Sequence, residues 1–123
     1  MTVEALRLRP DSDSFDSVTL EHDSVTDTHL QALYATLDVQ LVDVVRLPDK
    51  TDMWVSDEWR MDGSEPNRIA TNMLRAFGIH LGDADDVCGA VLFAGTDGQG
   101  AMASLTDRQR VVLANALVQA LRM

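Results

Sequence analysis

Carboxylates are the most abundant reactive side chains of this sequence, and two short segments contain groups of them that could bind a cation. DSDSFDSVTLEH, residues 11–22, begins like a calcium-binding loop, and GDADD, residues 82–86, places three aspartates within five positions. A calcium loop of the EF-hand type needs glycine at its sixth position and glutamate at its twelfth, where this sequence has Asp16 and His22. We therefore interpret the first segment as a solvated acidic turn and the second as a polar connection before a buried strand.

The other reactive residues match no catalytic or metal-binding motif. Cys88 is the only cysteine and lies in an apolar run, where a buried thiol is expected. The three histidines are far apart in sequence, and no G-x-S-x-G element occurs. GTDGQG, residues 95–100, lacks the glycine order of a dinucleotide-binding loop and is typical of a tight turn. We predict no catalytic residue, no metal site and no cofactor.

The charge balance restricts the kinds of partner. The 123 residues include 20 acidic and 10 basic side chains, for a formal net charge of -10, and residues 10–45 contain eight acids but no Lys or Arg. Because phosphate contacts need clustered Lys and Arg, we expect neither direct nucleic-acid binding nor attachment to an anionic membrane. A protein partner with a basic surface fits this charge. A merely solvated acidic surface, from genomic bias or a salt-loving source, is the alternative.

An acidic and partly aromatic surface is the leading candidate for partner binding. It combines carboxylates of the turn-rich segment 11–27 with two tryptophans that flank the sequence VSDE. An exposed tryptophan beside acids makes a good anchor for a partner protein, whereas two packed tryptophans would belong to the core. The predicted partner-binding residues are Asp11, Asp13, Asp16, Glu21, Asp23, Asp27, Trp54, Asp57, Glu58 and Trp59.

The start of a short helix offers a second candidate site. In SEPNRIATNMLRAFG, residues 64–78, Asn67 and Arg68 stand where a helix N-terminus and a guanidinium can bind an anion. This would make the protein a sensor of a small ligand or nucleotide. The alternative is that Asn67 caps the helix and Arg68 pairs with a neighbouring acid. A cryptic enzyme is a third hypothesis, and it would depend on Asp83, Asp85, Asp86 or His80.

Strand patterns place these residues along the chain. We predict strands at residues 2–8, 15–20, 39–47, 51–59, 87–95 and 101–105. The third and fourth form a hairpin around Pro48 and Asp49, and valines on both sides of the third indicate that both of its faces are partly covered. The fifth is a nearly continuous apolar run, which is the profile of a central strand.

Three segments have the apolar spacing of amphipathic helices. Residues 30–37 carry such a stripe, with Thr26 or Asp27 as the expected cap. Residues 64–78 are expected to start at a Ser64 or Glu65 cap, with Pro66 in the first turn and Gly78 at the end. Residues 106–122 begin with capping-box spacing and bury a predicted stripe of Leu113, Ala116, Leu117, Ala120 and Leu121.

The elements add up to one α+β domain with a mostly antiparallel sheet and about three helices. A chain of 123 residues suits a single domain, here with an acidic turn-rich segment at 11–27 and a C-terminal amphipathic helix at about 106–122. The start MTVEALRLRP does not resemble a signal peptide, and no apolar run reaches membrane-spanning length. We therefore expect a cytoplasmic protein, and nothing in the sequence sets its oligomeric state.

Four pieces of the sequence, in this order, resemble the domain-of-unknown-function family 3846. They are LQALYATL, VDVVRLPDKTDMWVSDEW, the helix start PNRIAT and the strand DDVCGAVLFAG, and SLTDRQ fits the family's tail. The sequence VQLVDVV stands where many members have a Gly-Gly turn, so this chain departs from the family there. The resemblance covers residues 30–95 and implies no established activity. It implies a small cytoplasmic accessory protein of actinobacteria or their phages. The phage context suggests an anti-defence or host-takeover role.

Overall fold

The computed structural model describes residues 2–22, 29–37, 42–56, 65–80, 86–99 and 101–123. Within these ranges the chain forms β1 (Thr2–Leu8), β2 (Asp16–Glu21), α1 (Leu30–Leu37), β3 (Val42–Leu47), β4 (Thr51–Ser56), α2 (Arg68–Ala76), β5 (Val91–Thr96), β6 (Met102–Ala103) and α3 (Asp107–Leu121).

The strands form a six-stranded sheet in which each pairing of these named strands is antiparallel. The spatial order is β2-β1-β5-β4-β3, and β6 pairs with the end of β5. β5 is central, as its apolar run predicts: Phe93 lies opposite Leu6 of β1 and Met53 of β4. With three helices on this sheet, the predicted α+β class is confirmed.

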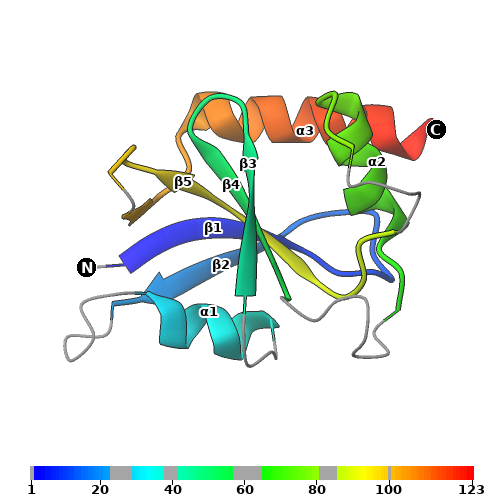
Figure 1. Cartoon of the computed structure of the whole chain (residues 1–123). Coiled ribbons are helices and arrows are strands. Elements are labelled where there is room, and N and C mark those ends of the chain that lie inside the picture. The colour runs from blue at the N-terminus through cyan, green and yellow to red at the C-terminus, as the bar shows by residue number, and fades with distance from the viewer. Residues whose placement is uncertain (1, 23–28, 38–41, 57–64, 81–85, 100) are drawn as a thin grey trace.

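Helices cover both faces of the sheet (Figure 1). Alternate residues of a strand point to opposite faces, and in β5 Phe93 belongs to the cluster beneath α2 and α3, whereas Leu92 belongs to the cluster beneath α1. Both faces of β3 are covered, as predicted, since Val42 packs on the α1 side and Val45 on the other. The larger cluster, on the α2 and α3 side, includes Leu6, Leu8, Met53, Val55, Met73, Leu74, Val91, Phe93 and Leu113.

The start of α2 differs from the prediction. Asn67 is the N-cap, because its side chain accepts a hydrogen bond from the Ala70 amide. Pro66 lies before the helix, in an isolated antiparallel bridge with Cys88, so its predicted place in the first helical turn is wrong. The predicted end is correct: Gly78 has φ of 79° and closes the helix in the left-handed conformation that favours glycine.

The predicted capping box of α3 is confirmed. The Thr106 hydroxyl accepts from the Gln109 amide at 3.1 Å, and the Gln109 side chain accepts from the Thr106 amide at 2.8 Å. The buried stripe is narrower than predicted, because Leu121 is 48% exposed. Leu121 lies three residues after Val118, so helical periodicity places it on the outer side of α3.

Strand boundaries shift by a few residues. β5 begins at Val91 instead of residue 87, because Cys88 pairs with Pro66 outside the sheet and Gly89 has a positive φ of 82°. β2 starts one residue later than predicted, at Asp16. Among the described residues, no helix has the length and apolar character needed to cross a membrane.

Candidate functional site

The turn between β1 and β2 carries the first group of predicted partner-binding carboxylates. Asp11 and Asp13 are exposed, and within the described part of the chain neither takes part in an ion pair. Asp16 is different, because its carboxylate lies 3.3 Å from Arg7 Nε and 3.2 Å from Arg9 Nε. Both basic side chains of this hairpin therefore contact Asp16, and neither forms an ion pair with Asp11 or Asp13.

Glu21 is exposed at the opposite end of the same hairpin. The register pairs Thr2 with Glu21 and Arg7 with Asp16. At about 3.3 Å per residue, the two ends of β2 are separated by roughly 16 Å. The structure therefore does not bring Glu21 into one cluster with Asp11 and Asp13. The predicted residues Asp23, Asp27, Asp57, Glu58 and Trp59 lie outside the described residues.

Trp54, on β4, packs against the hydrophobic core and does not project into solvent as an exposed anchor. It lies on β4 opposite Val44 and Leu92, and its ring packs against the hydrophobic cluster beneath α1. Its Nε1 is buried without a hydrogen-bond partner. Because β4 and β2 are separated by β5 and β1 in the sheet, Trp54 and the acidic turn do not form a continuous aromatic and acidic surface.

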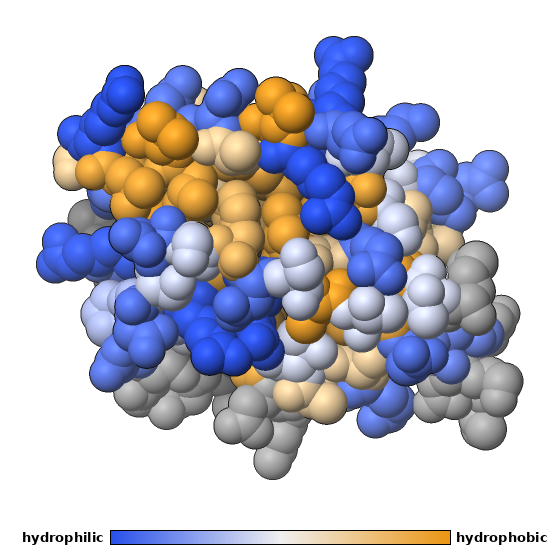
Figure 2. Space-filling view, turned by 180° about the vertical axis from the view of Figure 1, so that it is seen from behind, coloured by the Kyte–Doolittle hydropathy of each residue, from blue (hydrophilic) through white to orange (hydrophobic). Residues whose placement is uncertain are grey.

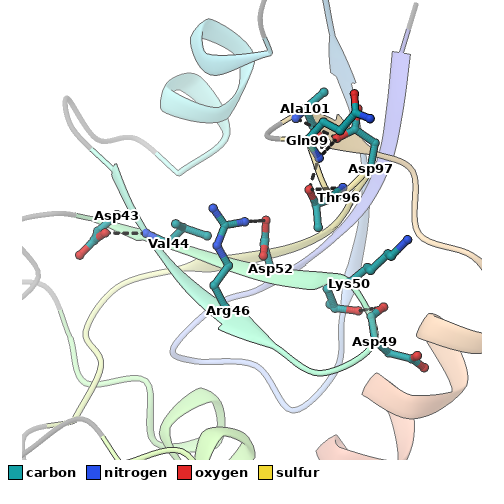
Figure 3. Close-up of polar contacts among 12 residues, drawn as sticks. Asp43, Val44, Arg46, Asp49, Lys50, Asp52, Thr96, Asp97, Gln99 and Ala101 are labelled. Carbon is teal, nitrogen blue, oxygen red and sulfur yellow. Dashed lines mark hydrogen bonds and ion pairs between the residues drawn. The ribbon is translucent and has the colours of Figure 1, made fainter.

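A buried carboxylate on the same strand was not singled out by the sequence. Asp52 is 3% exposed, and its carboxylate accepts a hydrogen bond of 2.8 Å from Arg46 on β3 (Figure 3). Arg46 itself is largely exposed. This ion pair joins β3 to β4 within their hairpin. It gives the buried carboxylate of Asp52 the oppositely charged partner that a buried charge generally requires.

Asn67 is fully engaged in holding the fold together. It is wholly buried, and its side-chain amide donates to the carbonyls of Leu8 at 3.1 Å and Gly89 at 3.0 Å. Its side-chain oxygen accepts from the Ala70 amide. Both side-chain donors are used internally, so the geometry supports the capping interpretation of Asn67 and gives a ligand no donor from it.

Arg68 remains accessible at the start of α2. Its side chain is 83% exposed, and its Nε lies 3.9 Å from the Asp86 carboxylate. An exposed pair at this distance contributes little to stability. Arg68 thus has the weak pairing with a neighbouring acid that the sequence offered as the alternative to ligand binding.

The structure also forms a pocket that sequence reasoning missed. A cavity of about 320 Å³ lies between the β3–β4 turn, the β5–β6 end and the start of α3. Lys50 and Arg108 line it, and Arg108 Nε lies 3.1 Å from the Asp49 carboxylate. The remaining lining residues are Gly95, Thr96, Ala103, Ser104, Thr106 and Gln109.

Gln109 forms part of the wall of this pocket. Its side-chain amide donates to the carbonyls of Asp49 at 2.8 Å and Lys50 at 3.0 Å. These carbonyls belong to the turn where Asp49 and Lys50 both have positive φ, 67° and 57°. The PDK turn signal and the capping box were visible in the sequence, but their juxtaposition depends on tertiary packing.

The reactive side chains form no metal cluster in the described parts of the chain. No group of three His, Cys, Asp or Glu residues gathers there at metal-binding distance. Two histidines that the sequence separates do meet, since the His22 and His29 rings lie 5.3 Å apart. Cys88 is half-buried, with its Sγ 3.5 Å from the Asp86 carbonyl oxygen. Asp83 and Asp85 lie outside the described residues.

Comparison with known proteins places the chain in a family without assigning it an activity. A search of curated proteins and a search of solved structures found no significant match. The model of the Domain of unknown function (DUF3846) matches residues 1–118, which is more of the chain than the segment 30–95 on which the resemblance was based. This match over nearly the whole chain shows that it belongs to the DUF3846 family.

Proposed function

We propose that this protein is a non-enzymatic accessory protein that binds a partner protein with a basic surface through its acidic side. The observation that supports the proposal is the distribution of charge on the β1–β2 hairpin. Arg7 and Arg9 both pair with Asp16, and the exposed carboxylates of Asp11 and Asp13 form no ion pair within the described residues. Glu21 adds an exposed acid at the far end of β2.

Such a surface acts mainly on the rate of association. Opposite charge accelerates the encounter of two proteins, and salt screens that attraction over about 8–10 Å at physiological ionic strength. A specific form of the proposal is nucleic-acid mimicry, in which the carboxylates occupy a phosphate-binding groove of a nuclease, a methyltransferase or a regulator. The family resemblance to phage proteins motivates an anti-defence or host-takeover role for this interaction.

Affinity capture from a lysate of the source organism tests the proposal. The protein is immobilised, and bound proteins are eluted in salt steps and identified by mass spectrometry. We expect one basic protein, captured in stoichiometric amount and released at moderate salt. The double variant Asp11→Asn/Asp13→Asn should reduce its capture by about tenfold, because the variant removes both carboxylates from the proposed contact. A tenfold change in affinity corresponds to about 1.4 kcal/mol of binding free energy.

A matched variant separates this surface from net charge alone. Glu65→Gln/Asp107→Asn changes the net charge by the same amount at two exposed acids outside the β1–β2 hairpin. Equal loss of capture by both double variants would contradict a specific surface at Asp11 and Asp13. Competition by duplex DNA for the captured protein would distinguish mimicry from other acidic recognition.

The small-ligand alternative has less support from the geometry. The side-chain donors of Asn67 are bonded to Leu8 and Gly89, and Arg68 stands alone at the surface beside Asp86. A ligand at this helix start would therefore depend on Arg68 and on backbone amides of α2. A cryptic enzyme has no described cluster of side chains to support it.

A further inference from the structure

Helix α3 has two apolar stripes, and only one of them is covered by the fold. The inner apolar stripe consists of Leu113, Ala116 and Ala120, which are buried in the hydrophobic cluster that the sheet and α2 also form. The outer stripe consists of Val111, Ala114, Val118 and Leu121, which are exposed. The outer residues repeat at intervals of three and four positions, which is the spacing of the a and d positions in a coiled-coil seam.

The outer stripe carries the most exposed large apolar side chains of the described chain. Val111 is 59% exposed, Val118 47%, Leu121 48%, and Met123, just beyond the helix, 64%. Figure 2 shows apolar side chains gathered on the face that α3 forms, bordered by hydrophilic ones. Single exposed apolar residues are ordinary on a surface, but a contiguous group with a polar border marks an interaction site.

The residues at the e and g positions beside the outer stripe are basic or neutral, whereas the exposed acid Asp107 lies one helical turn before Val111. Arg108, Asn115 and Arg122 occupy the e positions of the same heptads, and Arg110 and Leu117 occupy the g positions. Arg122 is exposed, and the pairing of Arg108 with Asp49 is at the surface, where it contributes little. Arg108, Arg110 and Arg122 outnumber the two acids at this face, Asp107 and Asp49, so in a chain of net charge -10 the face keeps a small positive excess around its apolar stripe.

We propose that the outer face of α3 docks an amphipathic helix of a partner protein, with an apolar a/d stripe flanked by Glu or Asp. The apolar stripe would bury Val111, Ala114, Val118 and Leu121, and acids at its flanks would meet Arg108, Arg110 and Arg122. Flanking charges of this kind set the choice of partner in helix pairs. This surface is separate from the acidic hairpin and opposite in charge.

Charge complementarity argues against a second copy of this chain as the occupant. Antiparallel pairing of two α3 helices would set Arg108 of one copy beside Arg122 of the other, and parallel pairing would set Arg110 beside the uncharged Asn115, so neither arrangement brings opposite charges together. Like charges facing each other at these positions are destabilising. An anionic membrane fits less well, because the stripe has no aromatic residue and the whole chain is strongly acidic.

A designed peptide tests the proposal directly. The probe is a labelled amphipathic helix of about four heptads, with Ile at a, Leu at d and Glu at every e and g position. The glutamates repel one another and keep the free peptide monomeric. The control peptide has Lys at the same positions. Binding to the full chain is followed by fluorescence anisotropy, and we expect the Glu peptide to bind at least about tenfold more tightly than the Lys peptide.

Two variants sharpen the test. Val118→Asp should weaken binding of the Glu peptide by about tenfold or more, and because Val118 is exposed the variant should melt like the wild type. Arg108→Glu/Arg122→Glu should reverse the preference so that the Lys peptide binds better. Asp11→Asn/Asp13→Asn should leave the affinity of the Glu peptide unchanged, which separates this surface from the proposed acidic one.

Several outcomes would overturn the proposal. No binding of the Glu peptide, or equal binding of the two peptides, would remove the charge complementarity on which the proposal depends. Sedimentation showing a dimer that Val118→Asp dissociates would assign the face to a second copy. Cosedimentation with anionic phosphatidylserine vesicles, abolished by Val118→Asp, would assign it to a membrane.

Discussion

Helices α2 and α3 both begin beside a buried carboxamide, but the two amide side chains hydrogen-bond to different parts of the fold. At α2, Asn67 is itself the cap, and its short side chain joins the end of β1 at Leu8 to Gly89 before β5. At α3, the longer Gln109 side chain reaches back to the cap at Thr106 and out to the β3–β4 turn. The first amide is wholly buried, whereas the second also lines an open cavity.

The difference shows what a buried amide does at a helix start. Only a carboxamide offers two donors and an acceptor in one neutral group, so it can cap a helix and bind carbonyls of other segments together. When every one of these groups is used, as at Asn67, the helix start is a structural joint. Gln109 also uses both of its donors and its acceptor, but unlike Asn67 it lines an open cavity.

Removing the joint at α2 should have the largest effect. Asn67→Ala leaves the carbonyls of Leu8 and Gly89 and the Ala70 amide without their present partners. We expect a loss of about 3 kcal/mol in the free energy of unfolding, at about 1 kcal/mol for each buried unpaired group. Urea denaturation followed by circular dichroism measures it.

Asn72→Ala is the matched control, on the same helix. Asn72 is half-buried and donates a long hydrogen bond of 3.4 Å to the Ala120 carbonyl. We expect this variant to lose no more than about 1 kcal/mol. Equal losses at the two positions would show that Asn67 is not the joint that the hydrogen bonds indicate.

Removing the amide at α3 should have a smaller effect. Gln109→Ala deletes the capping-box acceptor and the donor to Asp49 and Lys50, but the cavity lets water reach some of these groups. We expect a loss of about 2 kcal/mol. Gln119→Ala, at an exposed position of the same helix, should change stability by less than about 0.5 kcal/mol. A loss at Gln109 as small as that at Gln119 would contradict the assigned role.

Glycine at position 50 should relieve backbone strain in the β3–β4 turn that Gln109 contacts. Lys50 has φ of 57°, a conformation that costs a non-glycine residue roughly 1 kcal/mol. Glycine removes this cost, but its greater freedom in the unfolded chain offsets part of the stabilisation. Lys50→Gly should therefore raise the free energy of unfolding by about 0.5 kcal/mol. Lys50→Ala removes the same charge but keeps the strain and should not stabilise. Equal stabilisation by both variants would assign the effect to charge.

The sequence predicted the parts of these regions that depend on local patterns. The capping box at Thr106, the glycine end of α2 and the central place of β5 follow from residue spacing, and all were confirmed. The N-cap of α2 was missed by two or three residues, because the Asn67 bonds to Leu8 and Gly89 cross 59 and 22 positions of the chain. No local pattern reports such contacts.

The candidate sites also combine features that local sequence patterns predict with features that depend on tertiary structure. The exposure of Asp11 and Asp13 agrees with an acidic turn, but the capture of Arg7 and Arg9 by Asp16 depends on strand register. The outward position of Leu121 escaped notice because the residues 113, 116, 117, 120 and 121 all fit one broad helical stripe. Only packing on the sheet decides which side of that stripe is covered.

Arg68 provides the smallest effect and the sharpest test of the comparison. If the start of α2 is a joint and not a ligand site, Arg68→Gln should change the free energy of unfolding by less than about 0.5 kcal/mol, because its pair with Asp86 is exposed. Inorganic phosphate and a panel of nucleotides should then shift the melting temperatures of wild type and Arg68→Gln equally. A bound ligand stabilises only the folded chain that holds it. A phosphate-dependent rise in the wild type alone would therefore restore this helix start as a binding site, with Arg68 and the backbone amides of α2 as its donors.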